Sequence, residues 1–177
     1  MFTFFVYITN IFSPLSIIIV CVFLLVYILI YAYTKRLSFL GVFDRKVFAL
    51  FPDRVHALIM ICKSTVLAAV INAVLKHIYK IPRPIDMRIA ETGYSFPSGH
   101  AAVAFAFFTA IAVVIHIYKK RKVGYWLLLI PILVSISRVY LHVHRYIDVF
   151  VGASIGVLSV VCVIKIYTWY TKKSTQI

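Results

Sequence analysis

Runs of apolar residues long enough to cross a lipid bilayer constrain this chain more than any other feature. The run from Leu15 to Thr34 carries no charged residue, and about twenty apolar residues suffice for a helix to cross the hydrocarbon core. Hydrophobic residues make up 63% of the 177 residues, which is too many for a soluble domain of this length to bury. The sequence therefore predicts an all-α, polytopic transmembrane helix bundle.

The apolar runs divide the chain into five expected spanning helices within one membrane-embedded domain, residues 1–177. Met1–Phe12 is apolar but too short to span, and it predicts a short interfacial or re-entrant helix before Ser13-Pro14. Lys35–Arg54 mixes basic and apolar residues and predicts a loop lying partly in the interface. Lys76–Phe96 contains helix-breaking prolines and a glycine, and predicts an extramembrane loop. The expected spans are Leu15–Thr34, Val55–Leu75, Pro97–Tyr118, Val123–Val143 and Asp148–Tyr170.

The positive charge of the chain is concentrated on one side of the predicted bundle. The formal net charge is +14, and segments 35–54, 119–122 and 171–177 would share a side that carries eleven Lys or Arg residues. Lys and Arg collect in cytoplasmic loops of membrane proteins, so we expect this side to be cytoplasmic. The excess of basic residues then reflects orientation and anionic lipid, and we expect no nucleic-acid partner.

Three polar clusters fall on the predicted outer side. Ionisable groups at the border of a membrane segment are energetically costly and usually functional. Each cluster alone is a weak pattern, whereas all three in this order and on one side are highly specific. They are Lys76 with Arg83-Pro84 after six intervening residues, Pro97-Ser98-Gly99-His100, and Ser137-Arg138 followed by His144 and Asp148.

Together the clusters resemble the signature of the type 2 phosphatidic acid phosphatase superfamily, K-x6-RP, PSGH and SR-x5-H-x3-D. Every signature position is matched, and the resemblance covers about residues 55–165. It implies a six-helix membrane core and metal-independent hydrolysis of a lipid phosphate, with no cofactor and no metal site. Members of this superfamily include bacterial membrane lipid phosphatases and soluble vanadium haloperoxidases.

The residue types suit phosphoryl transfer. A transferring phosphoryl group spreads negative charge over its equatorial oxygens. Lys76, Arg83 and Arg138 would supply cations to bind them, and the arginine fork suits phosphate particularly well. Ser98 and Gly99 open a helix, where free backbone N–H groups and the helix dipole favour an anion.

The two signature histidines and the aspartate are the candidate catalytic residues. His144 would attack phosphorus and form a phosphohistidine. Asp148 lies four residues later, one turn away if the helix begins near His144, and would accept a hydrogen bond from Nδ1–H. His100 would protonate the leaving lipid oxygen and then activate water. By contrast, Asp86 and Glu91 are separated loop acids that make a poor metal site.

Several positions stand outside the signature. His142 matches no signature position, and we expect it to be structural or to line the pocket entrance. Many members carry tyrosine-proline-x before the aspartate, whereas this chain has Arg145-Tyr146-Ile147, which would alter lid shape or head-group preference. Arg145 itself could attract phosphate head groups or be an ordinary solvated charge.

The leading interpretation is a multi-pass lipid phosphatase of the bacterial inner (cytoplasmic) membrane, with its active site facing the periplasm or cell exterior. Its partners would be the bilayer and a membrane lipid phosphate, and the candidates are undecaprenyl pyrophosphate, phosphatidylglycerophosphate, phosphatidate and lipid A. One alternative is a vanadate-dependent haloperoxidase-like oxidoreductase, against which the five spans argue. The other is a non-enzymatic membrane scaffold or transporter, against which the unbroken signature argues. The residues leave the choice of lipid and the oligomeric state open.

Overall fold

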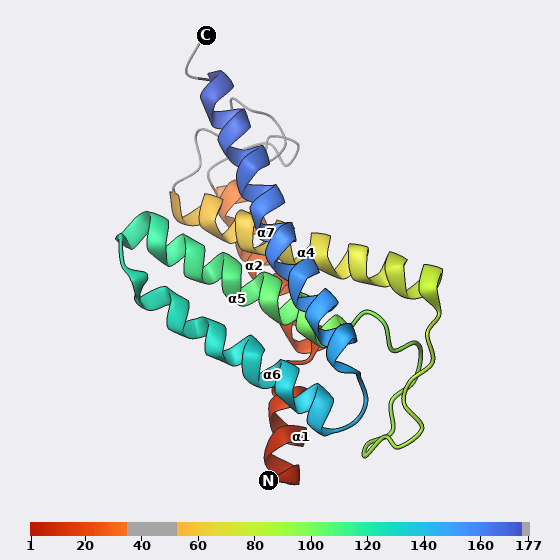
Figure 1. The fold of residues 1–177 in the computed structure, drawn as a ribbon. Coiled ribbons are helices and arrows are strands. Elements are labelled where there is room, and N and C mark those ends of the chain that lie inside the picture. Colours follow the sequence, from red (N-terminus) through yellow and green to blue (C-terminus); the bar gives the residue numbers. More distant parts are fainter. Residues whose placement is uncertain (35–52, 175–177) are drawn as a thin grey trace.

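The computed structural model describes residues 1–34 and 53–174, and over these residues the chain is helical and contains no strand. Nearly all of the expected interfacial loop 35–54 lies outside the described residues. The expected all-α bundle of five long apolar helices with an additional N-terminal helix is confirmed. The elements are α1 (Phe2–Ile11), α2 (Pro14–Thr34), α4 (Asp53–Tyr79), α5 (Gly99–Lys119), the 3₁₀ helix η2 (Lys122–Leu128), α6 (Leu129–Tyr140) and α7 (Tyr146–Ser174) (Figure 1).

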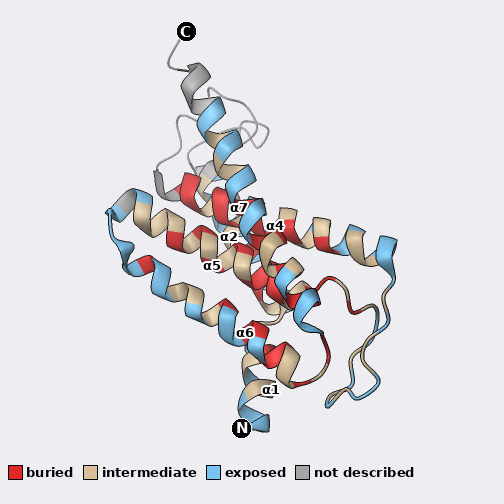
Figure 2. Cartoon of the chain, in the orientation of Figure 1, coloured by how far each residue is buried: buried red, intermediate tan, exposed pale blue. Residues whose placement is uncertain are grey.

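Helix α5 lies at the centre of the bundle and contacts α2, α4, α6, α7 and η2. Small side chains on α5 make this possible, because they let several helices approach one axis. Buried residues accordingly gather along the middle of α4, α5 and α7 (Figure 2). Six alanines of α5 have no exposed surface at all: Ala101, Ala102, Ala104, Ala106, Ala110 and Ala112.

Two glycines one turn apart bring α7 against α5. A Cβ atom at Gly152 would lie 2.4 Å from the carbonyl oxygen of Ser98, and one at Gly156 would lie 2.5 Å from that of Ala102. These distances are shorter than any real Cβ contact, so only glycine permits this approach. The contact fixes the start of α7 beside the start of α5, where the backbone N–H of Ser98 donates to the carbonyl of Asp148 at 2.9 Å.

Large apolar side chains cover the outside of the bundle. On α2, for example, Leu15, Phe23 and Ile30 are each more than half exposed. The described residues include five candidate membrane spans by length and composition. An apolar exterior over helices of this length is what a surrounding bilayer requires.

The expected helix Val123–Val143 is divided into η2 and α6, and it ends three residues early. Pro131 explains the division, since in a continuous α-helix its ring would clash with the carbonyl of Leu127. The α-helix instead begins at Leu129, which places Pro131 in its first turn. At the other end His142 adopts the left-handed conformation, with φ of 55°, and turns the chain towards α7.

The N-terminal helix α1 packs on α6 rather than standing apart. The rings of Phe5 and Tyr140 lie 4.6 Å apart, and Thr9 is 1% exposed. The hydroxyl of Ser13 accepts from the backbone N–H of Ser16 at 3.1 Å and so caps α2. The described structure therefore places α1 against the end of α6 that carries the SR motif.

Candidate active site

The three polar clusters of the sequence meet at one end of the bundle. In Figure 1 the α4–α5 connection and the α6–α7 connection lie at this end. The end of α4 supplies Lys76, the start of α5 supplies Ser98, Gly99 and His100, and the end of α6 supplies Arg138. The two connections add Arg83 and His144, and the first turn of α7 adds Asp148.

His144 is held between a cation and a carboxylate. Its Nε2 atom lies 3.3 Å from Nη1 of Arg83, and its Nδ1 atom lies 3.6 Å from Oδ2 of Asp148. The side chains of His144 and Asp148 are each 1% exposed. Because α7 begins at Tyr146, His144 precedes the helix, and the 3.6 Å between Nδ1 and Asp148 is longer than the expected direct hydrogen bond.

Ser95 joins His144 to Asp148, a link that the sequence did not reveal. The Ser95 hydroxyl donates to Oδ2 of Asp148 and lies 3.4 Å from Nδ1 of His144. The same carboxylate oxygen accepts from the backbone N–H of Arg145 at 2.9 Å. Ser95 has no exposed surface. Two donors thus hold the Asp148 carboxylate in place. One of them, the Ser95 hydroxyl, also lies beside the His144 ring.

The buried position of His144 favours its neutral form. Burial lowers the pKa of His144 to about 4, assisted by the charges of Arg138, Arg83 and Lys76 and opposed by the interaction with Asp148. At neutral pH the imidazole is therefore uncharged. A neutral ring can place the proton on Nδ1, facing Ser95 and Asp148, and a lone pair on Nε2.

The three expected phosphate-binding cations converge, and a fourth charged residue lies among them. Oε1 of Glu91 lies 2.6 Å from Nη2 of Arg138, and Oε2 lies 3.3 Å from Nη2 of Arg83. Lys76 donates to the carbonyl of Tyr94 at 2.9 Å. Burial would raise the pKa of Glu91, but the Arg138 and Arg83 guanidinium groups hold it below its ordinary value. Glu91 is therefore ionised, and it partners the cations rather than a metal ion.

Two buried hydrogen-bonding groups at the site have no partner among the described residues. These are Nε of Arg138 and the hydroxyl of Ser98. Buried polar atoms are nearly always satisfied, so unpaired donors at a cationic site are typical of a place where an anion binds. The backbone N–H of Ser98, in contrast, is already bonded to the carbonyl of Asp148 and is not available to an anion.

Asn72 adds another unpaired donor one helical turn before Lys76. Its Oδ1 atom would lie 3.2 Å from a Cβ atom at Gly99, which places the amide against the start of α5. Its Nδ2 atom is buried without a partner among the described residues. Asn72 is not a signature position, and its proximity to the PSGH motif depends on how α4 packs on α5.

His100 occupies the second position of α5 and is partly buried. It lies within electrostatic reach of Arg138, His144, Lys76 and Arg83. It is thus the second imidazole of the cluster, as the signature predicts.

Helix α1 provides a hydrogen-bond acceptor for Arg138. Its Nη1 atom donates to the hydroxyl of Thr9 at 3.0 Å, and the Ser137 hydroxyl donates to the same oxygen at 3.3 Å. Arg138 is completely buried. Thr9 precedes residues 55–165, over which the sequence resembles the superfamily, and it belongs to no motif. The sequence therefore could not identify Thr9 as part of the site.

The remaining polar residues of this end lie at the rim. His142 bonds to Asp86, and a hydrogen bond from the His142 ring lowers the pKa of that carboxyl. The guanidinium carbon of Arg88 lies 4.9 Å from the centre of the Tyr140 ring, and Arg145 is exposed. His142 therefore joins the α4–α5 connection to the α6–α7 turn. Among the described residues no group of three or more His, Cys, Asp or Glu side chains could hold a metal ion.

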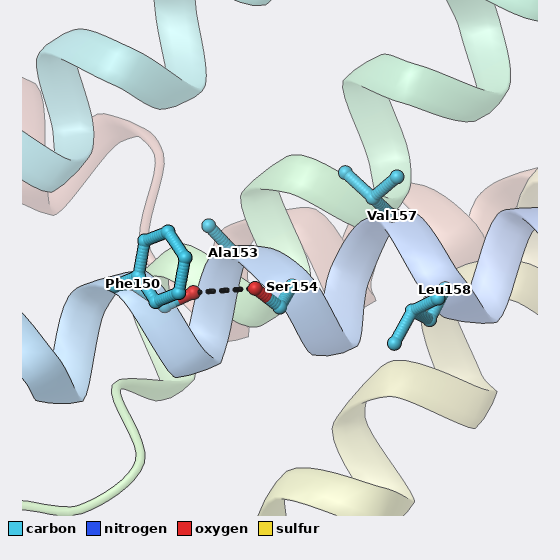
Figure 3. Close-up of a pocket in the computed structure, with 5 residues that line it drawn as sticks. All are labelled: Phe150, Ala153, Ser154, Val157 and Leu158. Atoms are coloured by element: carbon cyan, nitrogen blue, oxygen red, sulfur yellow. Dashed lines mark hydrogen bonds between the residues drawn. The ribbon is translucent and has the colours of Figure 1, made fainter.

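A groove of about 380 Å³ on α7 is separate from this cluster (Figure 3). Val157, in its lining, follows Asp148 by nine residues, which is two and a half helical turns and so the opposite face of α7. The groove belongs to the lipid-facing exterior. Its lining residues are Phe150, Ala153, Ser154, Val157 and Leu158.

Comparison with known proteins finds a matching family and several similar proteins. The model of the PAP2 superfamily matches residues 57–172. Phosphatidylglycerophosphatase B of Bacillus subtilis (strain 168) is 40% identical over 95 residues, which cover 50% of this chain and 47% of the relative. Dolichyldiphosphatase of Saccharomyces cerevisiae is 32% identical over 103 residues, which cover 51% and 43%. The chain therefore spans about half the length of these curated relatives.

Two crystal structures resemble the whole bundle. One is the first transmembrane PAP2-type phosphatidylglycerolphosphate phosphatase from Bacillus subtilis, with a TM-score of 0.60, 28% identity, and coverage of 94% of this chain and 76% of that one. The other is Aquifex aeolicus LpxE, with a TM-score of 0.53, 27% identity, and coverage of 92% and 93%.

Proposed function

Because the chain belongs to the PAP2 superfamily, we propose that it is an integral-membrane lipid phosphatase that acts through a phosphohistidine intermediate. One observation supports this proposal more strongly than the others do. A neutral, buried imidazole has Nε2 beside the Arg83 guanidinium and Nδ1 facing Ser95 and Asp148. That arrangement supplies an oriented nucleophile next to a group that binds phosphate oxygens.

In the first step Nε2 of His144 attacks phosphorus while the bond between phosphorus and the lipid oxygen breaks. His100 gives its proton to the leaving oxygen. Asp148, with Ser95, stabilises the positive charge that develops on the His144 ring. Lys76, Arg83 and Arg138 stabilise the equatorial oxygens, with additional donors from Ser98 and the start of α5 at Gly99.

In the second step water attacks the phosphohistidine. His100, now neutral, takes a proton from this water as the bond between Nε2 and phosphorus breaks. Inorganic phosphate leaves, and both histidines return to their starting states. No step requires a metal ion, since the three side-chain cations supply the positive charge that a metal would otherwise bring.

The substrate is a lipid with a terminal phosphate or diphosphate. Relatives named as a phosphatidylglycerophosphatase and a dolichyldiphosphatase support this class. We place the enzyme in the cytoplasmic membrane of a bacterium with the site on the outer face, a placement that rests on the distribution of basic residues. Undecaprenyl pyrophosphate, phosphatidylglycerophosphate, phosphatidate and lipid A are the candidate substrates.

A rapid-quench experiment tests the mechanism. Protein purified in detergent with EDTA is mixed with each candidate lipid labelled with ³²P at the terminal phosphate. We expect an acid-labile, base-stable protein-bound label and release of inorganic phosphate with at least one lipid. In His144→Ala the label should be absent and turnover reduced by about 10³-fold or more. Full turnover in His144→Ala, or turnover restored only by added Mg²⁺, would exclude this mechanism.

A further inference from the structure

A short segment of the α4–α5 connection, residues 91–94, occupies the donors of all three expected phosphate-binding cations. We call this segment the strap. The Glu91 carboxylate lies on Arg83 and Arg138, and backbone carbonyls of the strap accept from Arg83 and Lys76. Arg83 donates to the carbonyls of Thr92 and Gly93 at 3.1 and 3.2 Å, and Lys76 donates to that of Tyr94 at 2.9 Å.

The Glu91 carboxylate is the only charged group of the strap, and it spans two guanidinium groups. Its two oxygens face different arginines, at 2.6 Å from Arg138 and 3.3 Å from Arg83. Arginine forks bind carboxylate and phosphate through the same geometry. Nη1 of Arg83 lies 3.3 Å from Nε2 of His144, while Nη2 of the same guanidinium binds Glu91. Glu91 therefore occupies a donor of the group that would bind phosphate oxygens next to the proposed nucleophile.

The strap is placed so that a ligand could replace it. The Glu91 side chain is 26% exposed, although Arg138 beneath it is completely buried. Gly93 has φ of 76°, and a Cβ atom there would meet no described atom within 4 Å. The strap thus has open space around a conformationally permissive residue.

We propose that Glu91 is an internal competitor for the phosphate site, a carboxylate that any incoming phosphate must displace. The inference rests on the proposed function, because it assigns the same cations to phosphate. Displacement of Glu91 costs the same free energy for every anion, so it lowers all anion affinities by a common factor. A terminal phosphate carries about two negative charges at neutral pH and binds in spite of this cost. A phosphodiester carries one charge, as Glu91 does, and binds the cations more weakly, so the diester head groups of the surrounding membrane do not fill the site.

The test compares two soluble anions on the full chain in detergent at pH 8. Dissociation constants for inorganic phosphate and dimethyl phosphate are measured by ³¹P NMR, with no turnover required. We expect the unaltered protein to prefer inorganic phosphate. In Glu91→Gln both anions should bind more tightly by a similar factor, on the order of tenfold, so that the preference between them stays nearly unchanged.

Two further variants separate this role from a structural one. Asp86→Asn removes an equal charge from the same connection, but Asp86 pairs with His142 and not with Arg83 or Arg138, so both dissociation constants should stay unchanged. Glu91→Asp keeps the charge and should keep both anions nearly as weakly bound as in the unaltered protein. Thermal unfolding and gel filtration verify that each variant is folded.

The outcomes distinguish the inference from the proposed function. Weaker binding of both anions in Glu91→Gln would mean that Glu91 positions the arginines, and it would overturn the inference. Unchanged dissociation constants in a Glu91→Gln protein that still hydrolyses lipid phosphate would overturn the inference alone. Tighter binding of both anions in a Glu91→Gln protein, when the unaltered chain hydrolyses none of the candidate lipids, would uphold the inference and overturn the proposed function. Absence of phosphate binding in every variant would overturn both.

Discussion

At the residue scale, the site depends on a few buried groups whose neighbours set their protonation. His144 lies between Arg83 on one side and the Ser95–Asp148 pair on the other. Burial and the nearby cations hold its ring neutral, which a nucleophile requires, while Asp148 limits how far its pKa falls. The same residues therefore decide both the reactivity of His144 and its orientation.

The pH dependence of kcat/KM should report this environment. Burial and neighbouring cations lower the pKa of His144 to about 4, so the ring is protonated and unreactive below that pH and reactive above it. We expect the acidic limb of kcat/KM near pH 4, about two units below that of an ordinary histidine. Asp148→Asn removes the group that raises this pKa and should move the limb lower. A limb at pH 6.5 that Asp148→Asn leaves in place would contradict the assignment.

Ser95→Ala tests the link between His144 and Asp148. The substitution removes the hydroxyl that donates to Asp148 and lies 3.4 Å from the His144 ring. We expect kcat to fall by about tenfold to a hundredfold, the equivalent of one or two lost hydrogen bonds in a buried site. KM should change little. Ser154→Ala, in the groove on α7 that is separate from the site, serves as the control, and equal losses in both variants would argue against the link.

At the element scale, the ends of four helices and the N-terminal helix build the site. Close packing of α5 on α7 sets the distance between the PSGH motif and Asp148. The 3₁₀ segment η2 lets α6 start at Leu129 and present Arg138 in its last turn. Helix α1 contributes Thr9, whose hydroxyl accepts a hydrogen bond from Arg138.

Gly152→Ala should separate α5 from α7. The new methyl group would lie 2.4 Å from the Ser98 carbonyl, so one helix must shift. We expect a loss of about 1–3 kcal/mol of stability, as for overpacking in a core, visible as a lower Tm in detergent. Activity should fall more than Tm alone explains, because the bond from Ser98 to Asp148 lies beside the shift. An unaltered Tm would show that the helices are not packed this tightly.

Thr9→Val tests the contribution of α1. Valine keeps the shape of threonine but removes the acceptor for Nη1 of Arg138, which is completely buried. An unsatisfied buried donor costs about 1–3 kcal/mol. We therefore expect kcat/KM to drop by about tenfold or more. Thr9→Ser retains the hydroxyl and should retain most of the activity, and failure of serine to do so would point to packing instead.

At the scale of the whole molecule, the bundle presents an apolar exterior to lipid and gathers its functional charges at one end. The α4–α5 connection contains some of these charged residues, and its Ile85 side chain is fully exposed. The basic turn at residues 119–122 follows α5, whose other end begins the site. The two ends of α5 therefore lie on opposite sides of any membrane that it crosses.

Cysteine labelling measures the orientation. In a chain from which Cys21, Cys62 and Cys162 have been removed, Ile85→Cys should react with a membrane-impermeant maleimide added outside intact bacterial cells. Arg121→Cys, in the basic turn, should react only after the cells are opened. The reverse pattern would place the site on the cytoplasmic side and contradict the orientation expected from the basic residues.

Much of the bundle and the identity of the signature residues follow from the sequence alone. Apolar runs predict spans because the hydrocarbon core demands a minimum length. The three clusters indicate phosphate chemistry because they combine cations, the start of a helix and two histidines at the spacings of the signature. The division of the fourth helix could also have been read from Pro131, whose steric effect is local.

The tertiary structure alone decided which other residues complete the site. Thr9 bonds to Arg138 across 129 positions of sequence, and Ser95 bonds to Asp148 across 53. Glu91 looked like an isolated loop acid, yet the path of the connection places it on two arginines. These contacts arise because helix packing and loop paths bring together residues that are distant in sequence. The periodicity and spacing of residues within one segment do not predict such contacts. The apolar runs therefore predict which segments cross the membrane, whereas packing determines what the end of the bundle that carries the polar cluster can bind.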